Sequence, residues 1–130
     1  MKKFYIAQFA LITFFSSCED TEITGSENVS EIENVTFSQV VTTISNNALV
    51  ASGVIINNNQ SLSISPPWYI ECQYYYSNSM GNTFLIGGEN IRINNALPPG
   101  ISLEWTLEHT VENAESYMNF TIDQLRAYKN

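Results

Sequence analysis

Residues 101–111 read Ile-Ser-Leu-Glu-Trp-Thr-Leu-Glu-His-Thr-Val, and they alternate between apolar and polar side chains throughout. A period of two residues is typical of a β-strand with one face in a core and the other in water. The pattern predicts that Trp105 lies in the core and that Glu104 faces solvent. The single histidine, His109, falls on the apolar phase. We therefore expect a half-buried core histidine rather than a catalytic base.

The same period of two recurs from Val35 onward, in strand-length segments separated by clusters of Asn, Gly and Pro. We predict six further strands, over residues 35–44, 48–56, 68–76, 83–86, 91–93 and 117–123. Seven short strands at these spacings indicate an all-β fold, a single antiparallel β-sandwich over residues 35–130.

Three positions predict irregularities within or between these strands. The alternation slips between Gln39 and Val40, which indicates a β-bulge. Gly53 stands inside a strand and marks a bulge or a close approach of another group to the backbone. The pair Gly87-Gly88 is expected to form a turn between two strands.

The C-terminal segment is less regular. In the strand predicted over 117–123, Met118, Phe120 and Ile122 are expected to point inward. The tail from Gln124 either extends that strand past a bulge or ends as a helical turn, and the sequence leaves both alternatives open.

The N-terminus has the order of residues found in a secretory signal. Lys2 and Lys3 precede an apolar run over residues 4–15, and two serines stand ahead of Cys18. This run of 12 residues is too short to span a bilayer. The order resembles the signal of bacterial lipoproteins, in which the cysteine is lipidated and the segment before it is removed. The resemblance implies that residues 1–17 are a cleaved signal peptide and that Cys18 carries palmitate-containing lipid.

Residues 18–34 are rich in Glu and Asp and contain no basic residue. Such a segment buries too little apolar surface to order itself, so we predict a flexible tether between the lipid and the sandwich. Acidic residues directly after a lipidated cysteine also resemble the export tag of some Gram-negative surface lipoproteins. The resemblance implies a lipid-anchored protein of the bacterial envelope, on the outer membrane or at the cell surface. The alternative is a solvated linker with no sorting role.

Size and charge restrict the classes of partner. Removing 17 of the 130 residues leaves 113, enough for one domain with a modest core. Loss of Lys2 and Lys3 takes the formal charge from −8 to −10. A surface so acidic repels phosphates, so we expect no nucleic-acid partner and attachment to the membrane through lipid alone.

Cys72 is expected to be a buried thiol, since free cysteine is among the most buried residue types.

Three short motifs follow one another between residues 48 and 110. Gly53, Ile55 and Asn57 fit the pattern Gly-x-Val-x-Asn, and an aromatic strand closes on the turn at Gly81. Leu97, Pro99 and Gly100 then fit Leu-x-Pro-Gly before the long alternating strand. These motifs resemble the FxLYD domains of bacterial extracytoplasmic proteins, although Ser77 stands where that family has Tyr. The resemblance implies an immunoglobulin-like sandwich and, because its motifs are structural, implies no activity.

The sequence contains no recognisable catalytic motif. A Gly-x-Ser-x-Gly elbow, a phosphate-binding glycine loop and a His/Cys cluster with zinc spacing are all missing from it. We therefore expect no enzymatic activity, no metal and no cofactor apart from the lipid on Cys18.

Four side chains share the outward phase of the strand 68–76 and form the candidate binding surface: Tyr69, Glu71, Gln73 and Tyr75. Tyrosine is enriched in binding hot spots, so we predict a protein-binding or accessory module of an envelope assembly. A glycan-binding lipoprotein, in which the tyrosines stack on sugars, is one alternative. An inhibitor or immunity lipoprotein is the other.

Overall fold

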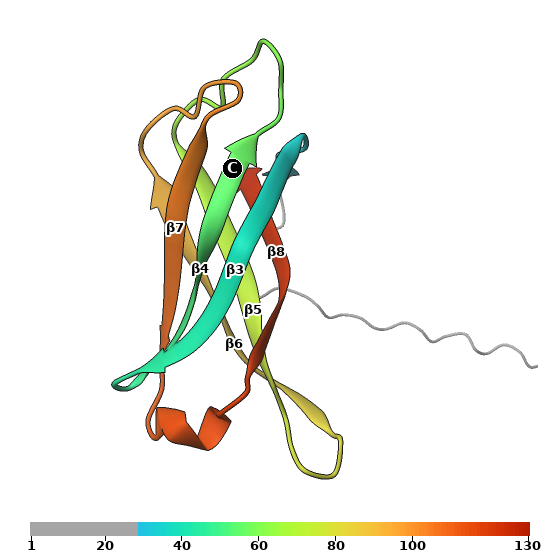
Figure 1. Ribbon diagram of the computed structural model, residues 1–130, viewed down its shortest axis with the longest axis vertical. Coiled ribbons are helices and arrows are strands. Elements are labelled where there is room, and N and C mark those ends of the chain that lie inside the picture. The colour runs from blue at the N-terminus through green and yellow to red at the C-terminus, as the bar shows by residue number, and fades with distance from the viewer. Residues whose placement is uncertain (1–28) are drawn as a thin grey trace, which may run out of the picture.

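The computed structural model describes residues 29–130 (Figure 1). The predicted signal peptide, Cys18 and most of the predicted tether lie outside the described residues. Within them the chain forms seven strands and one short 3-10 helix. In order these are β2 (Ser30–Glu31), β3 (Val35–Ser45), β4 (Ala48–Asn57), β5 (Trp68–Ser77), β6 (Thr83–Ile93), β7 (Ser102–Thr110), η2 (Ala114–Tyr117) and β8 (Thr121–Lys129).

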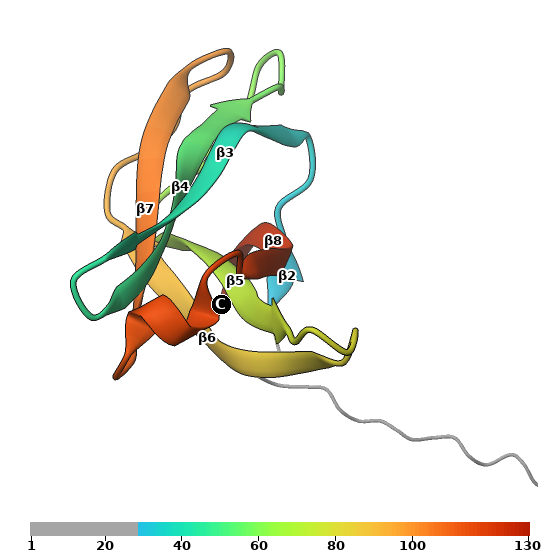
Figure 2. The same cartoon turned by 60° about the horizontal axis from the view of Figure 1, so that its bottom comes forward.

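The strands form two antiparallel sheets that pack face to face. One sheet has the order β2-β8-β5-β6 and the other the order β3-β4-β7, and Figure 2 shows them as two layers. The largest fully buried side chains come from both sheets and include Trp68, Tyr74, Leu49, Ile55, Ile70 and Leu107. The predicted all-β fold, a single antiparallel sandwich of seven strands, is confirmed. No helix within residues 29–130 has the length and apolar character needed to cross a membrane.

Strand β7 supplies the centre of the core, as its alternation predicts. Trp105 is buried and meets the ring of Phe37 edge-on, with ring centroids 5.9 Å apart. Gly53 lies opposite Trp105 in the sheet, and a Cβ there would stand 3.0 Å from the indole Cζ2. The close approach predicted at Gly53 is therefore confirmed.

The bulge predicted in β3 is also confirmed. The register of β3 on β4 shifts between Ser38 and Val41, and Gln39 has a φ of 54°. Val40 and Val41 are left exposed at the irregularity.

The turn predicted at Gly87-Gly88 is wrong, because β6 continues through both glycines from Thr83 to Ile93. They pair with Tyr74 and Gln73 on β5. A Cβ on Gly87 would stand 2.6 Å from Cε1 of His109, so this position is glycine because an imidazole from the opposite sheet packs on it.

The strand predicted over residues 117–123 begins four residues later than predicted, and the structure settles the open alternative for the tail. The chain first forms η2, in which the Met118 N–H donates to the Glu115 carbonyl, and Met118 is exposed rather than inward. Strand β8 then begins at Thr121 and runs to Lys129, past an irregularity at Gln124, where φ is 54°. The tail therefore extends the strand past a bulge.

Strand β2 lies within the segment predicted as a tether. Ser30 and Glu31 pair with Lys129 and Tyr128, and the Ile32 N–H donates to the Ala127 carbonyl at 2.8 Å. Backbone pairing does not depend on apolar side chains, so composition did not reveal this strand. The ordered domain therefore begins before residue 35. We call the end of the sandwich that holds β2 and Lys129 the proximal end, and the end that holds η2 and the β5–β6 turn the distal end (Figure 1).

Candidate functional site

The four predicted site residues lie in a row on the outward face of β5, which is the strand between β8 and β6. The other face of β5 supplies the buried side chains of Ile70, Cys72 and Tyr74. In register beside the row are Tyr128, Arg126 and Asp123 on β8, and Arg92, Asn90 and Gly88 on β6. The structure thus brings Tyr69, Glu71, Gln73 and Tyr75 together with residues from two neighbouring strands.

The proximal half of this face is an aromatic and charged cluster. The rings of Tyr69 and Tyr128 stack with centroids 5.1 Å apart and an interplanar angle of 16°. The guanidinium carbon of Arg126 lies 5.3 Å from the centroid of the Tyr128 ring, within the range of a cation–π contact. Tyr128 is only 3% exposed on this outward face. Burial raises the pKa of its phenol, which is therefore a neutral group at physiological pH.

The two polar members of the row are less accessible than their outward phase suggests. Glu71 and Gln73 are both buried. The Arg126 Nε donates to the Glu71 carboxylate, and the Tyr75 hydroxyl donates to the Gln73 side-chain oxygen. Neighbouring side chains of the same face therefore cover Glu71 and Gln73, so their outward phase does not make them accessible to solvent. Tyr69 and Tyr75 are half-buried and form the accessible part of the row.

Basic groups gather at the same half of the sheet. Residues 29–130 contain three basic side chains, Arg92, Arg126 and Lys129. Their register partners on the neighbouring strands are Tyr69, Glu71 and Ser30, respectively. The cluster therefore combines positive charge with tyrosines in a chain whose formal charge is −8.

Sequence reasoning missed Tyr128 and Arg126, the two residues that complete the cluster. Both lie beyond Gln124, in the tail whose conformation the pattern left open. Thr121 and Asp123 share the outward face before the irregularity at Gln124, and Arg126 and Tyr128 share it afterwards. A search for a period of two that allows a bulge at Gln124 would therefore have found both residues.

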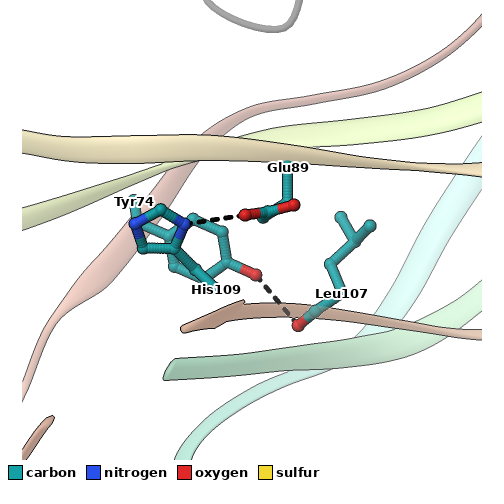
Figure 3. A network of polar contacts seen from close by, with 4 residues as sticks. All are labelled: Tyr74, Glu89, Leu107 and His109. Carbon is teal, nitrogen blue, oxygen red and sulfur yellow. Dashed lines mark hydrogen bonds and ion pairs between the residues drawn. The ribbon is translucent and has the colours of Figure 1, made fainter. Parts of the chain in front are cut away.

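His109 belongs to a second cluster of polar side chains, which lies between the two sheets (Figure 3). Its Nδ1 lies 2.8 Å from a carboxylate oxygen of Glu89 on β6, and its ring stacks on Tyr74 with centroids 5.3 Å apart. The Tyr74 hydroxyl donates to the Leu107 carbonyl at 2.9 Å. The imidazole is 18% exposed, which confirms the expected half-buried core histidine. This group connects β6 to β7 across the open edge of the sandwich.

The free thiol is held in the core. Cys72 is buried, as predicted, and burial raises the pKa of its thiol to about 12. Since the thiolate is the nucleophilic form of cysteine, this thiol is inert in the folded domain at neutral pH. Within residues 29–130, no group of three or more His, Cys, Asp or Glu side chains is arranged to hold a metal ion.

Comparison of the chain with protein-family models, with curated proteins and with solved structures found no match. The resemblances to bacterial lipoproteins and to FxLYD domains therefore stay predictions, and the candidate site is interpreted from its own geometry.

Proposed function

We propose that this chain is a lipid-anchored, non-catalytic binding module of the bacterial envelope. Cys18 carries the lipid, the immunoglobulin-like sandwich is the binding domain, and the outward face of β5 contacts a protein of the same compartment. The proposed partner contact centres on Tyr69 and Tyr75, with Arg126 and Tyr128 beside them.

The observation that supports this proposal is that the side chains of the outward face already pack against one another in the chain by itself. Tyr69 is stacked on Tyr128, and Arg126 lies over Tyr128 while bonding Glu71. Side chains that are already fixed lose little conformational entropy on binding, which favours affinity. A face on which tyrosine and arginine meet also has the composition of a protein-binding hot spot.

The same stack favours a protein partner over a glycan. Tyr128 covers one face of the Tyr69 ring, so a sugar ring would have only the opposite face for stacking. A protein surface contacts ring edges, hydroxyls and the guanidinium as readily as ring faces. We therefore propose an envelope protein as the partner.

The test compares a pull-down from envelope extract with a glycan array, using the mature lipoprotein and its Tyr69→Ala/Tyr75→Ala variant. We expect the parent to retain a specific envelope protein and the variant to bind it at least tenfold more weakly, equivalent to about 1.4 kcal/mol. The matched control is Glu104→Ala/Thr106→Ala, which alters two exposed residues on the other sheet.

The melting temperature of both variants is measured as well, because loss of the Tyr69 stack is expected to lower the free energy of unfolding by about 0.5 to 1.5 kcal/mol. Equal binding by the parent and the tyrosine variant would refute the proposed surface. Retention of glycans in place of a protein would establish the glycan-binding alternative instead.

A further inference from the structure

Large apolar side chains are exposed at the distal end of the sandwich. Met80 in the β5–β6 turn is 83% exposed, Phe84 and Leu85 on β6 are 51% and 54% exposed, and Met118 after η2 is 62% exposed. Figure 1 shows that the β5–β6 hairpin extends past the neighbouring strands at this end. Its apolar side chains therefore have no opposing sheet to cover them.

Met80, Phe84 and Met118 are grouped at this end with two half-buried tyrosines, whereas Leu85 is the register partner of Tyr75 and shares the outward face of β5. Phe84 is the register partner of Tyr76, so the two side chains share a face of the hairpin. The ring of Tyr76 meets that of Tyr117 edge-on, with centroids 5.6 Å apart, and Met118 follows directly. We call this set the distal apolar surface: Tyr76, Met80, Phe84, Tyr117 and Met118.

The turn that displays Met80 is held by hydrogen bonds. The side-chain oxygen of Asn78 accepts from the backbone N–H groups of Met80 and Asn82, both at 3.0 Å. The Gly81 N–H donates to the Asn78 carbonyl at 3.0 Å, and Gly81 adopts a φ of 87°. The turn is thus fixed with its methionine in solvent, and docking would require little ordering of the backbone.

The charges on the η2 side of the distal apolar surface, beside Tyr117 and Met118, are negative. The loop that carries η2 places Glu112 and Glu115 at this end, and both are exposed. The three basic residues of the described chain pair in register at the other half of the β5 sheet, towards the proximal end. An apolar surface with carboxylates on one side repels anionic headgroups and a second copy of that side, and it attracts a basic surface.

We propose that the distal apolar surface docks a protein whose contact site has an apolar centre bordered by Lys or Arg. This contact is additional to the one proposed on β5 and does not depend on it. It lies opposite the proximal end, where the preceding chain joins the domain through β2.

The test is photocrosslinking of the full chain in its native host, with a benzophenone amino acid in place of Met80 or Met118. The matched control sites are Leu62 and Ile101, which are 65% and 49% exposed and lie at the proximal end. We expect one protein adduct from both distal sites and none from the control sites. The crosslinked peptide should combine apolar residues with Lys or Arg.

Two variants then examine the chemistry of the contact in the chain with the crosslinker at Met118. Phe84→Ser removes exposed apolar area, and the pair Glu112→Lys/Glu115→Lys reverses the bordering charge. Each is expected to reduce the adduct at least tenfold with an unchanged melting temperature, since the altered side chains are exposed.

The outcomes separate this proposal from its competitors. An adduct to lipid would assign the surface to membrane contact, and an adduct between two copies of the chain would assign it to self-association, so either result overturns the proposal. Equal adducts at distal and control sites, or none at any site, overturn it as well. An adduct that survives the charge reversal refutes the basic partner.

Discussion

The packing of His109 on Gly87 makes a strong prediction about the glycine. Gly87 does not adopt a left-handed backbone conformation, so the change Gly87→Ala brings no backbone strain. In an open position this change stabilises a protein by about 0.4 to 1 kcal/mol, because it restricts the unfolded chain. Here, however, the new Cβ would stand 2.6 Å from Cε1 and 2.7 Å from Nε2 of the imidazole, closer than van der Waals contact allows.

The imidazole has little freedom to move away. It is held by Glu89 on one side and by the stacked ring of Tyr74 on the other, and Tyr74 is itself fully buried. Overpacking of this kind destabilises by about 1 to 3 kcal/mol. We therefore expect Gly87→Ala to lower the free energy of unfolding by about 1 to 3 kcal/mol in the parent protein.

Removing the imidazole should reverse the sign of the effect. In a His109→Ala background the same glycine change should stabilise by about 0.4 to 1 kcal/mol. The double-mutant cycle therefore predicts a coupling energy of at least about 1.4 kcal/mol between the two positions. Urea denaturation of the parent, the two single variants and the double variant measures it. Additive effects within about 0.5 kcal/mol would refute the close packing of His109 on Gly87.

Two further predictions concern the core. Trp105→Ala should lower the free energy of unfolding by about 3 to 5 kcal/mol in urea denaturation, because it removes a buried indole and leaves a cavity. The change Glu104→Ala at its exposed neighbour should alter the free energy of unfolding by no more than about 0.5 kcal/mol. Comparable losses from the two changes would contradict the assigned faces of β7. Because burial raises the pKa of the Cys72 thiol to about 12, the folded state keeps a proton that the unfolded chain releases above about pH 9. The thiol's contribution to stability is therefore complete below pH 9 and falls by up to about 1.4 kcal/mol per pH unit above it. Cys72→Ala should flatten this part of the stability profile, and a profile identical to that of the parent would show that the thiol ionises freely.

The features predicted correctly from the sequence are those set by local pattern. The alternation of residues 101–111 placed Trp105 in the core, and the slip at Gln39 located a bulge. Both depend on neighbours in the chain, because a strand that is buried on one face carries its period in its own side chains.

The features that were missed depend on contacts between distant segments. Gly87 resembles a turn residue until His109 is placed against it from the other sheet. Glu71 is outward in phase, but side chains of β8 that lie more than fifty positions later cover it. Strand β2 is held by backbone hydrogen bonds to β8, and such bonds cannot be predicted from the amino-acid composition of the segment. None of these could be derived before the pairing of the strands was known.

The claim on which the proposed function depends is the lipid on Cys18, and metabolic labelling with palmitate tests it directly. Cells expressing the parent chain or its Cys18→Ser variant are labelled, and the protein is followed by partition into detergent. We expect the parent to incorporate label and to enter the detergent phase, while the variant does neither and keeps the circular dichroism of a folded β-sandwich. An unlabelled parent, or a Cys18→Ser variant that still partitions into detergent, would contradict it.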